Sequence, residues 1–296
     1  MKKITLLFAL LLSQSVIAAP LEIKFANIAP EGSAWANIME EMDQAIQTRS
    51  GNRLKFKFYW GGVMGDEPDM LRKLRINQIQ AAGLTGFGLG QISPTVRVLE
   101  LPMIFPDAAA LDVAKGKILN QLKEEFRKKG FEFLGWADVG PIYIFSNKPI
   151  QSVEDMKGIK IWMWEGDPLA GAAFKALGVS PSPLAVTDVL TSLQTGLIDA
   201  FYGPPLGVSA LQWHTRVKYV LDERFNYAIG GFVISSKTFQ ALSPDLRKII
   251  SEESEKYCQK LVERTREDNQ KTFELLKKGG IQAVLLKPTE KEKLLK

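Results

Sequence analysis

The sequence predicts an α/β fold, in which short strands alternate with helices. Three observations support this prediction. Segments with strict alternation of apolar and polar residues, such as residues 54–60, are typical of strands. Segments with apolar residues three and four positions apart, such as residues 35–46, are typical of helices. The order β-α-β-α-β occurs twice, which favours helices layered on mostly parallel sheets.

The first part of the chain contains three predicted strands separated by helices. The strands lie at residues 21–27, 54–60 and 80–85. The helix between the first two ends at Gly51, a residue type that commonly follows the last turn. The next helix begins at Asp66 with Pro68, because Asp caps free backbone N–H groups and Pro fits the first turn.

The second part continues the pattern and finishes with one long helix. We predict a helix at 109–129, strands at 131–138, 142–147 and 198–202, and helices capped by Asp167 and Thr187. From Ser243 to Gly280 the apolar residues keep helical spacing almost without interruption. A helix of this length is too extended for one lobe, so we expect it to bridge two lobes or to bend between them.

The N-terminus has the pattern of a secretory signal peptide. Lys2 and Lys3 form a basic segment, residues 4–12 are apolar, and residues 16–18 resemble a cleavage signal. We therefore assign residues 1–19 to a signal peptide and expect the mature protein in the periplasm. No other stretch is long and apolar enough to cross a bilayer.

Composition argues for binding rather than catalysis. The formal net charge is only +5, with both signs interspersed, which argues against nucleic acid as a partner. The single cysteine, Cys258, excludes an internal disulfide. With one histidine, His214, the chain lacks the residues for most metal sites and for nucleophile–histidine pairs. We expect no metal, no cofactor and no enzymatic activity.

Residues 156–168, MKGIKIWMWEGDP, place two tryptophans one residue apart, just before an acidic turn. In a strand, alternation puts Trp162 and Trp164 on one face with Lys160. The opposite face is then aliphatic and consists of Ile159, Ile161 and Met163. The aliphatic face is typical of a core, and the function of the protein depends on what the aromatic face contacts.

Several phrases in this order, behind a signal peptide, resemble the substrate-binding proteins of TRAP (tripartite ATP-independent periplasmic) transporters. The resemblance covers essentially the whole mature chain and rests on Ser50-Gly51, residues 61–66 (GGVMGD), Leu101-Pro102 with Phe105, residues 156–161 (MKGIKI), Leu177-Gly178 and residues 193–199 (LQTGLID).

The resemblance implies a two-lobed clamshell that traps a small organic solute between α/β lobes joined by the long C-terminal helix. It assigns residues 20–140 with about 232–296 to lobe 1, and residues 141–231 to lobe 2. It also implies delivery of the solute to membrane-embedded TRAP subunits, and we expect a monomer. Compared with that family, the C-terminal helix is expected to be short here, because the sequence stops at Lys296.

The chain departs from this family where the family binds carboxylates. Trp162 fills a slot that typically holds an arginine, and Pro141 fills a slot where a second arginine is common. Gly203 replaces a frequent asparagine. An arginine binds a carboxylate through two parallel hydrogen bonds, so the usual carboxylate clamp is missing in lobe 2.

Ligands of open α/β sheets bind beyond the carboxyl ends of the strands, and several predicted strands here end in polar or aromatic residues. The candidate solute-binding residues are Trp162, Trp164, Tyr202, Glu67, Phe87, Trp136 and Asn27. We expect the tryptophans to form an aromatic platform in place of the charge clamp. Such a platform suits a cationic or zwitterionic solute, and it equally suits a flat aromatic one.

Structural roles are open for some of these residues. Trp164 could only brace Trp162, and the Tyr202 hydroxyl could either bind solute or cap a strand. Asp66 and Asp167 are expected to cap helices, and Trp35 and Trp60 fit the apolar face of their own elements. The glycine-rich residues 83–90 lack the lysine of a phosphate-binding loop, so we reject that function.

Two rival functions remain open at the level of sequence. A secreted hydrolase could use a pair of carboxylates such as Glu67 and Glu165, which would have to face each other across a cleft. A binding partner of a membrane sensor would share the fold and differ only in its membrane client.

Overall fold

The computed structural model of the chain describes residues 19–290. The predicted signal peptide therefore lies, except for its last residue, outside the described residues. The strands are β1 (Leu21–Ala26), β2 (Leu54–Tyr59), β3 (Ala81–Thr85), β4 (Phe131–Ser146), β5 (Trp162–Trp164), β6 (Ser182–Leu184), β7 (Ala200–Gly203), β8 (Tyr219–Ser235) and β9 (Gln282–Val284). The α-helices are α1 (Ala34–Ser50), α2 (Glu67–Arg75), α3 (Gly86–Ile92), α4 (Ala108–Lys128), α5 (Val153–Lys157), α6 (Pro168–Ala176), α7 (Val189–Thr195), α8 (Pro205–Ala210), α9 (Ser236–Ala241) and α10 (Pro244–Lys278). Three 3₁₀ helices complete the set: η1 (Pro94–Glu100), η2 (Val186–Asp188) and η3 (Trp213–Arg216).

The main sheet is mixed. Its strands are hydrogen-bonded in the order β2-β1-β3-β8-β4-β7, and β9 pairs with β8. The β2-β1-β3 part is parallel, as the alternating β-α-β order predicts. The pairs β3–β8, β8–β4 and β4–β7 are antiparallel. The expected α/β class with mostly parallel or mixed sheets is therefore confirmed, and the main sheet is mixed.

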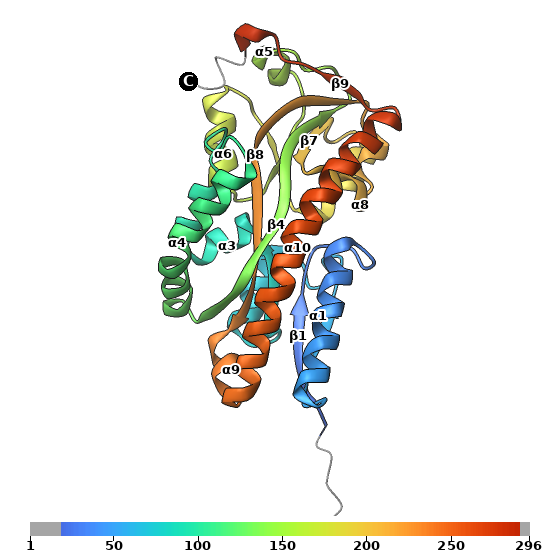
Figure 1. Cartoon of the computed structure of the whole chain (residues 1–296). Helices are drawn as coiled ribbons and strands as arrows, with labels where there is room; N and C mark the ends of the chain where they lie inside the picture. The colour runs from blue at the N-terminus through green and yellow to red at the C-terminus, as the bar shows by residue number, and fades with distance from the viewer. Residues whose placement is uncertain (1–18, 291–296) are drawn as a thin grey trace, which may run out of the picture.

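Two long strands run through the whole molecule side by side (Figure 1). The sequence predicts two separate strands at 131–138 and 142–147, and this division is wrong. The chain forms a single strand, β4, which pairs with β8 along its length. The pairing changes register at three places: between Phe133 and Gly135, between Asp138 and Gly140, and between Ile142 and Ile144. A β-bulge before Gly140 leaves one residue of β4 unpaired, and the strand continues through Gly140 and Pro141.

Four apolar cores divide the molecule into two lobes. Two of them are built around β1, β2 and β3, and they define lobe 1; Phe25 and Phe126 are fully buried there. The other two are built around β5 and β7 in lobe 2, where Phe145 and Phe201 are fully buried. One of them also includes Phe87 of α3, which contributes from lobe 1. β4 and β8 contribute residues to cores of both lobes, so the lobes share continuous strands.

The helix α10 also joins both lobes. Its first part, including Leu246 and Ile250, packs in a core of lobe 1, and its last part, including Phe273 and Leu276, packs in a core of lobe 2. Figure 1 shows this helix running along β4 over most of the length of the molecule. The predicted bridging helix is confirmed. None of the helices within residues 19–290 has the length and hydrophobicity needed to span a bilayer.

Candidate functional site

A cavity of about 260 Å³ lies between the two lobes. Its walls come from the ends of β1 and β3, from α3 and η1 in lobe 1, and from β5, β7, α6 and α8 in lobe 2, with the middle of β4 and β8 behind. Most lining residues are apolar or aromatic. The polar ones are Asn27, Glu67, Thr85, Arg97, Glu100, Asp138, Asp167, Tyr202 and Asn226.

Six of the seven candidate residues meet at this cavity: Asn27, Glu67, Phe87, Trp162, Trp164 and Tyr202. The seventh, Trp136, does not line it. Its ring packs against Phe133 in a core of lobe 1, and the ammonium group of Lys115 lies over it. β4 changes register between Phe133 and Gly135, and after this shift Trp136 lies on the side of the strand that packs with Phe131 and Phe133. Its neighbour Ala137 faces the cavity instead.

The two tryptophans of β5 form part of an aromatic wall, which we define as Trp162, Trp164, Tyr202 and Trp213. Trp162 stacks on Tyr202, with ring centroids 4.9 Å apart and planes 25° apart. Trp213 meets Trp162 edge-on at 5.5 Å. The alternation predicted from sequence is present: the tryptophans pack in one core of lobe 2, and Ile161 packs in the other.

Hydrogen bonds fix the orientation of this wall. The indole Nε1–H of Trp162 donates to the carbonyl oxygen of Leu184 at 3.0 Å. The Tyr202 hydroxyl accepts from the backbone N–H of Trp164 at 3.3 Å, so it holds β7 against β5. Trp162 is only 2% exposed although it lines the cavity, which leaves little freedom for its ring to move.

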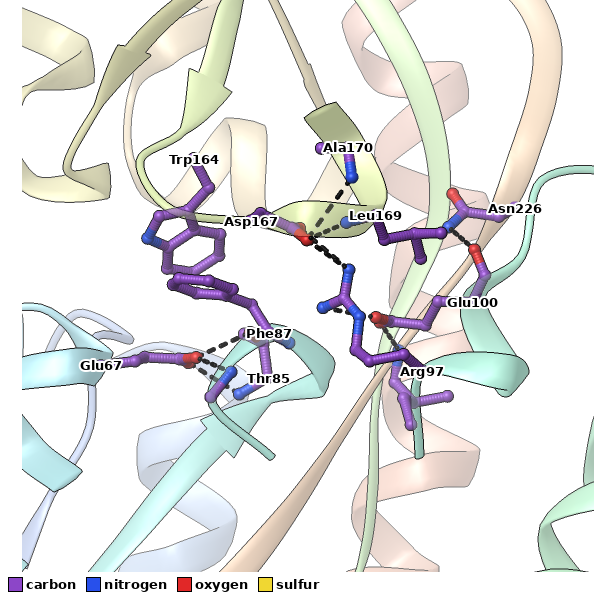
Figure 2. A network of polar contacts seen from close by, with 12 residues as sticks. Glu67, Thr85, Phe87, Arg97, Glu100, Trp164, Asp167, Leu169, Ala170 and Asn226 are labelled. Atoms are coloured by element: carbon purple, nitrogen blue, oxygen red, sulfur yellow. Dashed lines mark hydrogen bonds and ion pairs between the residues drawn. The ribbon is translucent and has the colours of Figure 1, made fainter. Parts of the chain in front are cut away.

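Trp164 also contacts lobe 1. Its Nε1–H donates to Oδ2 of Asp66 at 2.8 Å, and the backbone N–H of Val186 donates to the same oxygen at 3.1 Å. Asp66 caps α2 as predicted, through its Oδ1 and the N–H of Glu67. The ring of Trp164 lies 4.9 Å from the ring of Phe87, on the lobe 1 side (Figure 2). One carboxylate therefore serves as a helix cap and as a contact between the lobes.

Glu67 is fully buried beneath α3. Its carboxylate accepts hydrogen bonds from the N–H groups of Thr85 and Gly88 and from the Thr85 hydroxyl. Burial raises the pKa of Glu67 to about 8, against the opposing effect of these hydrogen bonds. A side chain at Gly88 would collide with this carboxylate, because an added Cβ would lie 2.5 Å from its Oε2.

Arg97 lines the cavity and is a candidate residue that sequence reasoning missed. Its Nη2 donates to both oxygens of Asp167 at 2.9 Å, and its Nη1 lies 3.1 Å from Oε2 of Glu100 (Figure 2). Asp167 belongs to lobe 2 and caps α6 as predicted, through the N–H groups of Leu169 and Ala170. The ion pair therefore crosses the cavity. The family phrases flank Arg97 without including it, so no motif marked it.

A second group of charges lies behind the cavity. Asp138 is buried and accepts from Lys115 at 2.8 Å and from Arg266 at 2.6 Å. Arg266 also binds Asp112, so α4, β4 and α10 are joined by two cations and two carboxylates. The Nε1–H of Trp35 donates to the backbone oxygen of Asp138 at 3.3 Å, so this tryptophan both packs on a core and lines the cavity.

Glu67 and Glu165, the carboxylate pair named for a hydrolase, do not face each other across the cavity. Glu165 is exposed and is not among the residues that line the cavity, and Glu67 is bound by backbone N–H groups. Within residues 19–290, no cluster of three or more histidine, cysteine, aspartate or glutamate side chains could hold a metal ion.

A cavity enclosed by two lobes that share strands and a long helix defines a two-lobed solute-binding protein. The model of the family described as bacterial extracellular solute-binding protein, family 7, matches residues 25–296. The chain belongs to this family. The family consists of solute receptors of TRAP transporters, so the protein is a receptor and not an enzyme.

Individual relatives agree with the family. The chain is similar to the 2,3-diketo-L-gulonate-binding periplasmic protein YiaO of Escherichia coli, with 28% identity over 83% of this chain and 75% of that protein. Its fold matches a TRAP periplasmic solute-binding protein from Sulfitobacter with bound β-D-galacturonate, with a TM-score of 0.86, 22% identity, and coverage of 93% and 92% of the two chains. A TRAP protein from Haemophilus influenzae with bound L-gulonate matches with a TM-score of 0.86, 21% identity, and coverage of 93% and 90%.

Proposed function

We propose that this receptor captures a small organic solute against the aromatic wall and closes its two lobes around it. The observation that carries the proposal is the cavity itself, because six of the seven residues chosen from sequence line it and come from both lobes. A solute bound there touches both lobes, so its binding favours the closed arrangement.

The moving bodies in this proposal are residues 20–140 with about 232–296, and residues 141–231. The four apolar cores support this division, since two are built around β1 to β3 and two around β5 and β7. The strands β4 and β8 and the helix α10 cross between the bodies, so hinge bending has to occur within them.

The proposed cellular role is delivery of the solute to membrane-embedded TRAP subunits from the periplasm, by a monomeric receptor. The signal-peptide pattern of residues 1–19 supports export, and YiaO is named as a periplasmic protein. The relatives described above bind sugar acids, which supports a small organic molecule as cargo here.

The cargo of this chain need not share the carboxylate of those sugar acids. The aromatic wall places an indole, Trp162, in the slot where the resemblance implies an arginine. An indole face binds flat, apolar or cationic groups, and it offers no charge-assisted hydrogen bonds to an anion.

A thermal-shift screen combined with small-angle scattering tests the proposal. The screen covers sugar acids, aromatic acids, their amides, amines and betaines. We expect one class to raise the melting temperature by several degrees, because a ligand that binds only the folded state stabilises it. At saturation, scattering should report a contracted particle. A melting temperature that no class changes, or a bound solute without contraction, would contradict the proposal.

A further inference from the structure

The cavity provides one cation, and the protein neutralises it. Of the residues that line the cavity within the described part of the chain, Arg97 is the only lysine or arginine. The guanidinium is bound by Asp167 across the cavity and by Glu100 beside it. All three side chains are largely buried, with 15%, 7% and 6% of their surface exposed, so the charges interact with little screening by water.

Asp167 makes the contacts with Arg97 that a bound carboxylate would make. Both of its oxygens accept from Nη2 at 2.9 Å, so the arginine already holds a carboxylate. The Asp167 side chain is fixed from its own lobe as well, because its Oδ1 accepts from Leu169 N–H at 2.9 Å. A solute carboxylate would have to displace a carboxylate that is held in place by a helix.

The other carboxyl groups at the cavity already have partners within the protein, and those partners leave no cation free for an anionic solute. Asp138 is paired with Lys115 and Arg266 from behind the cavity. Glu67 is held by the N–H groups of Thr85 and Gly88. An anionic solute therefore meets one engaged cation and several carboxyl groups.

We propose, on the basis of the proposed solute-binding function, that Asp167 is a built-in carboxylate that makes this receptor select solutes without a carboxylate. The favoured cargo is an uncharged or singly cationic molecule with a flat or apolar face. The face packs on the aromatic wall, and a cationic group lies toward Asp167 and Glu100. The Nε of Arg97 is buried without a hydrogen-bond partner among the described residues, so the guanidinium is held through its two terminal nitrogens.

Three probes with one skeleton and different charges test this selection: benzoate, benzamide and benzylamine, with D-galacturonate added as a sugar acid. Titration calorimetry compares the wild type with Asp167→Asn. Asparagine caps a helix as well as aspartate does, so this variant keeps α6 and removes only the charge. Asp107→Asn is the matched control, because Asp107 caps α4 in the same way and does not line the cavity.

We expect the ratio of carboxylate affinity to benzamide affinity to rise by about tenfold or more in Asp167→Asn, since a freed guanidinium regains a charge-assisted partner. The ratio separates this effect from any general weakening of closure. The Asp107→Asn control should match the wild type. In the double variant Arg97→Met/Asp167→Asn the gain should disappear, because it depends on the guanidinium.

Two results would overturn the inference. One is a wild type that binds benzoate or D-galacturonate more tightly than benzamide and benzylamine. The other is Asp167→Asn without a gain for either carboxylate. Both results leave the solute-binding function intact, which fails only if no solute class stabilises the wild type or contracts it.

Discussion

The indole Nε1–H of Trp164 donates to the carboxylate of Asp66 across the cleft at 2.8 Å, and both groups are buried. The same Asp66 oxygen accepts from the backbone N–H of Val186. Two donors of lobe 2 thus converge on one acceptor of lobe 1. This contact forms between protein groups alone, so we propose that it favours the closed arrangement independently of the solute.

Replacing Asp66 by Asn should open the solute-free protein. Asparagine has one side-chain oxygen, whereas Asp66 uses one oxygen to cap α2 and the other to accept from lobe 2. If the asparagine oxygen caps α2, its NH₂ group faces the two donors of lobe 2 and cannot accept from them. Loss of this contact should destabilise the closed arrangement by about 1–3 kcal/mol. We expect a larger radius of gyration in small-angle scattering than for the wild type. An unchanged radius, with Asp107→Asn measured alongside, would show that the contact does not hold the lobes together.

Glu67 should make the stability of the protein depend on pH. Burial raises its pKa from the ordinary value of 4.5 to about 8 in the folded state. Between these pH values the folded state keeps a proton that the unfolded state releases. The free energy of unfolding therefore falls as pH rises from about 4.5 to about 8, by an amount on the order of a few kcal/mol.

The Glu67→Gln variant should lose most of that pH dependence, because glutamine does not titrate. Urea unfolding at several pH values between about 5 and 8 measures the effect. Exposed Glu124 on α4 provides the control, since Glu124→Gln should keep the slope of the wild type. Equal slopes in Glu67→Gln and the wild type would argue that Glu67 is ionised in the folded protein throughout this range.

Glu100 should make the binding of cations depend on pH. Burial raises the pKa of Glu100 to about 7, while Arg97 opposes the shift. Below about pH 7 the carboxyl is mostly protonated, and above it the negative charge beside the solute increases. The affinity for benzylamine should therefore rise from pH 6 to pH 8, and that for neutral benzamide should change little. Parallel profiles for the two probes would exclude Glu100 as the cause.

Gly140 should be essential for the bulge where β4 passes between the lobes. Its φ is +131°, and an added Cβ would lie 2.3 Å from Nδ2 of Asn269, whose amide also binds Val139 and Leu206. Gly140→Ala should destabilise the fold by about 1–3 kcal/mol or more. Gly116→Ala is the matched control, because Gly116 lies in α4 with open space around it and alanine gains up to about 1 kcal/mol there. Chemical denaturation of both variants should give shifts of opposite sign.

The sequence predicts most of the local structure and the bridging helix α10, because these depend on periodicity within one segment. It does not predict the continuity of β4, since the strand β8 that supports the bulge at Gly140 lies about 90 residues away in the chain. The sequence points to Trp162 because a family slot and β alternation agree there, and to Trp164 because alternation puts it on the same face.

The polar contacts of the site join residues that are far apart in the sequence, so local patterns do not predict them. Arg97 and Asp167 are 70 residues apart in the chain and come from different lobes. Glu67 looks free beside the helix cap Asp66, yet the glycines of α3 let it pack under that helix. Trp136 has the same residue type as three members of the aromatic wall, but it packs in a core of lobe 1 together with Phe133, after a change of register in β4. Such contacts depend on tertiary distance, which no local pattern encodes.

The central claim is that the aromatic wall, rather than an arginine clamp, binds the solute. Titration calorimetry of the solute found in the thermal-shift screen tests it most directly in Trp162→Ala, with Trp60→Ala as the control, because Trp60 packs on a core of lobe 1 and does not line the cavity. We predict a loss of affinity of about tenfold or more in Trp162→Ala, with little change in Trp60→Ala. An affinity in Trp162→Ala equal to that of the wild type would contradict the claim.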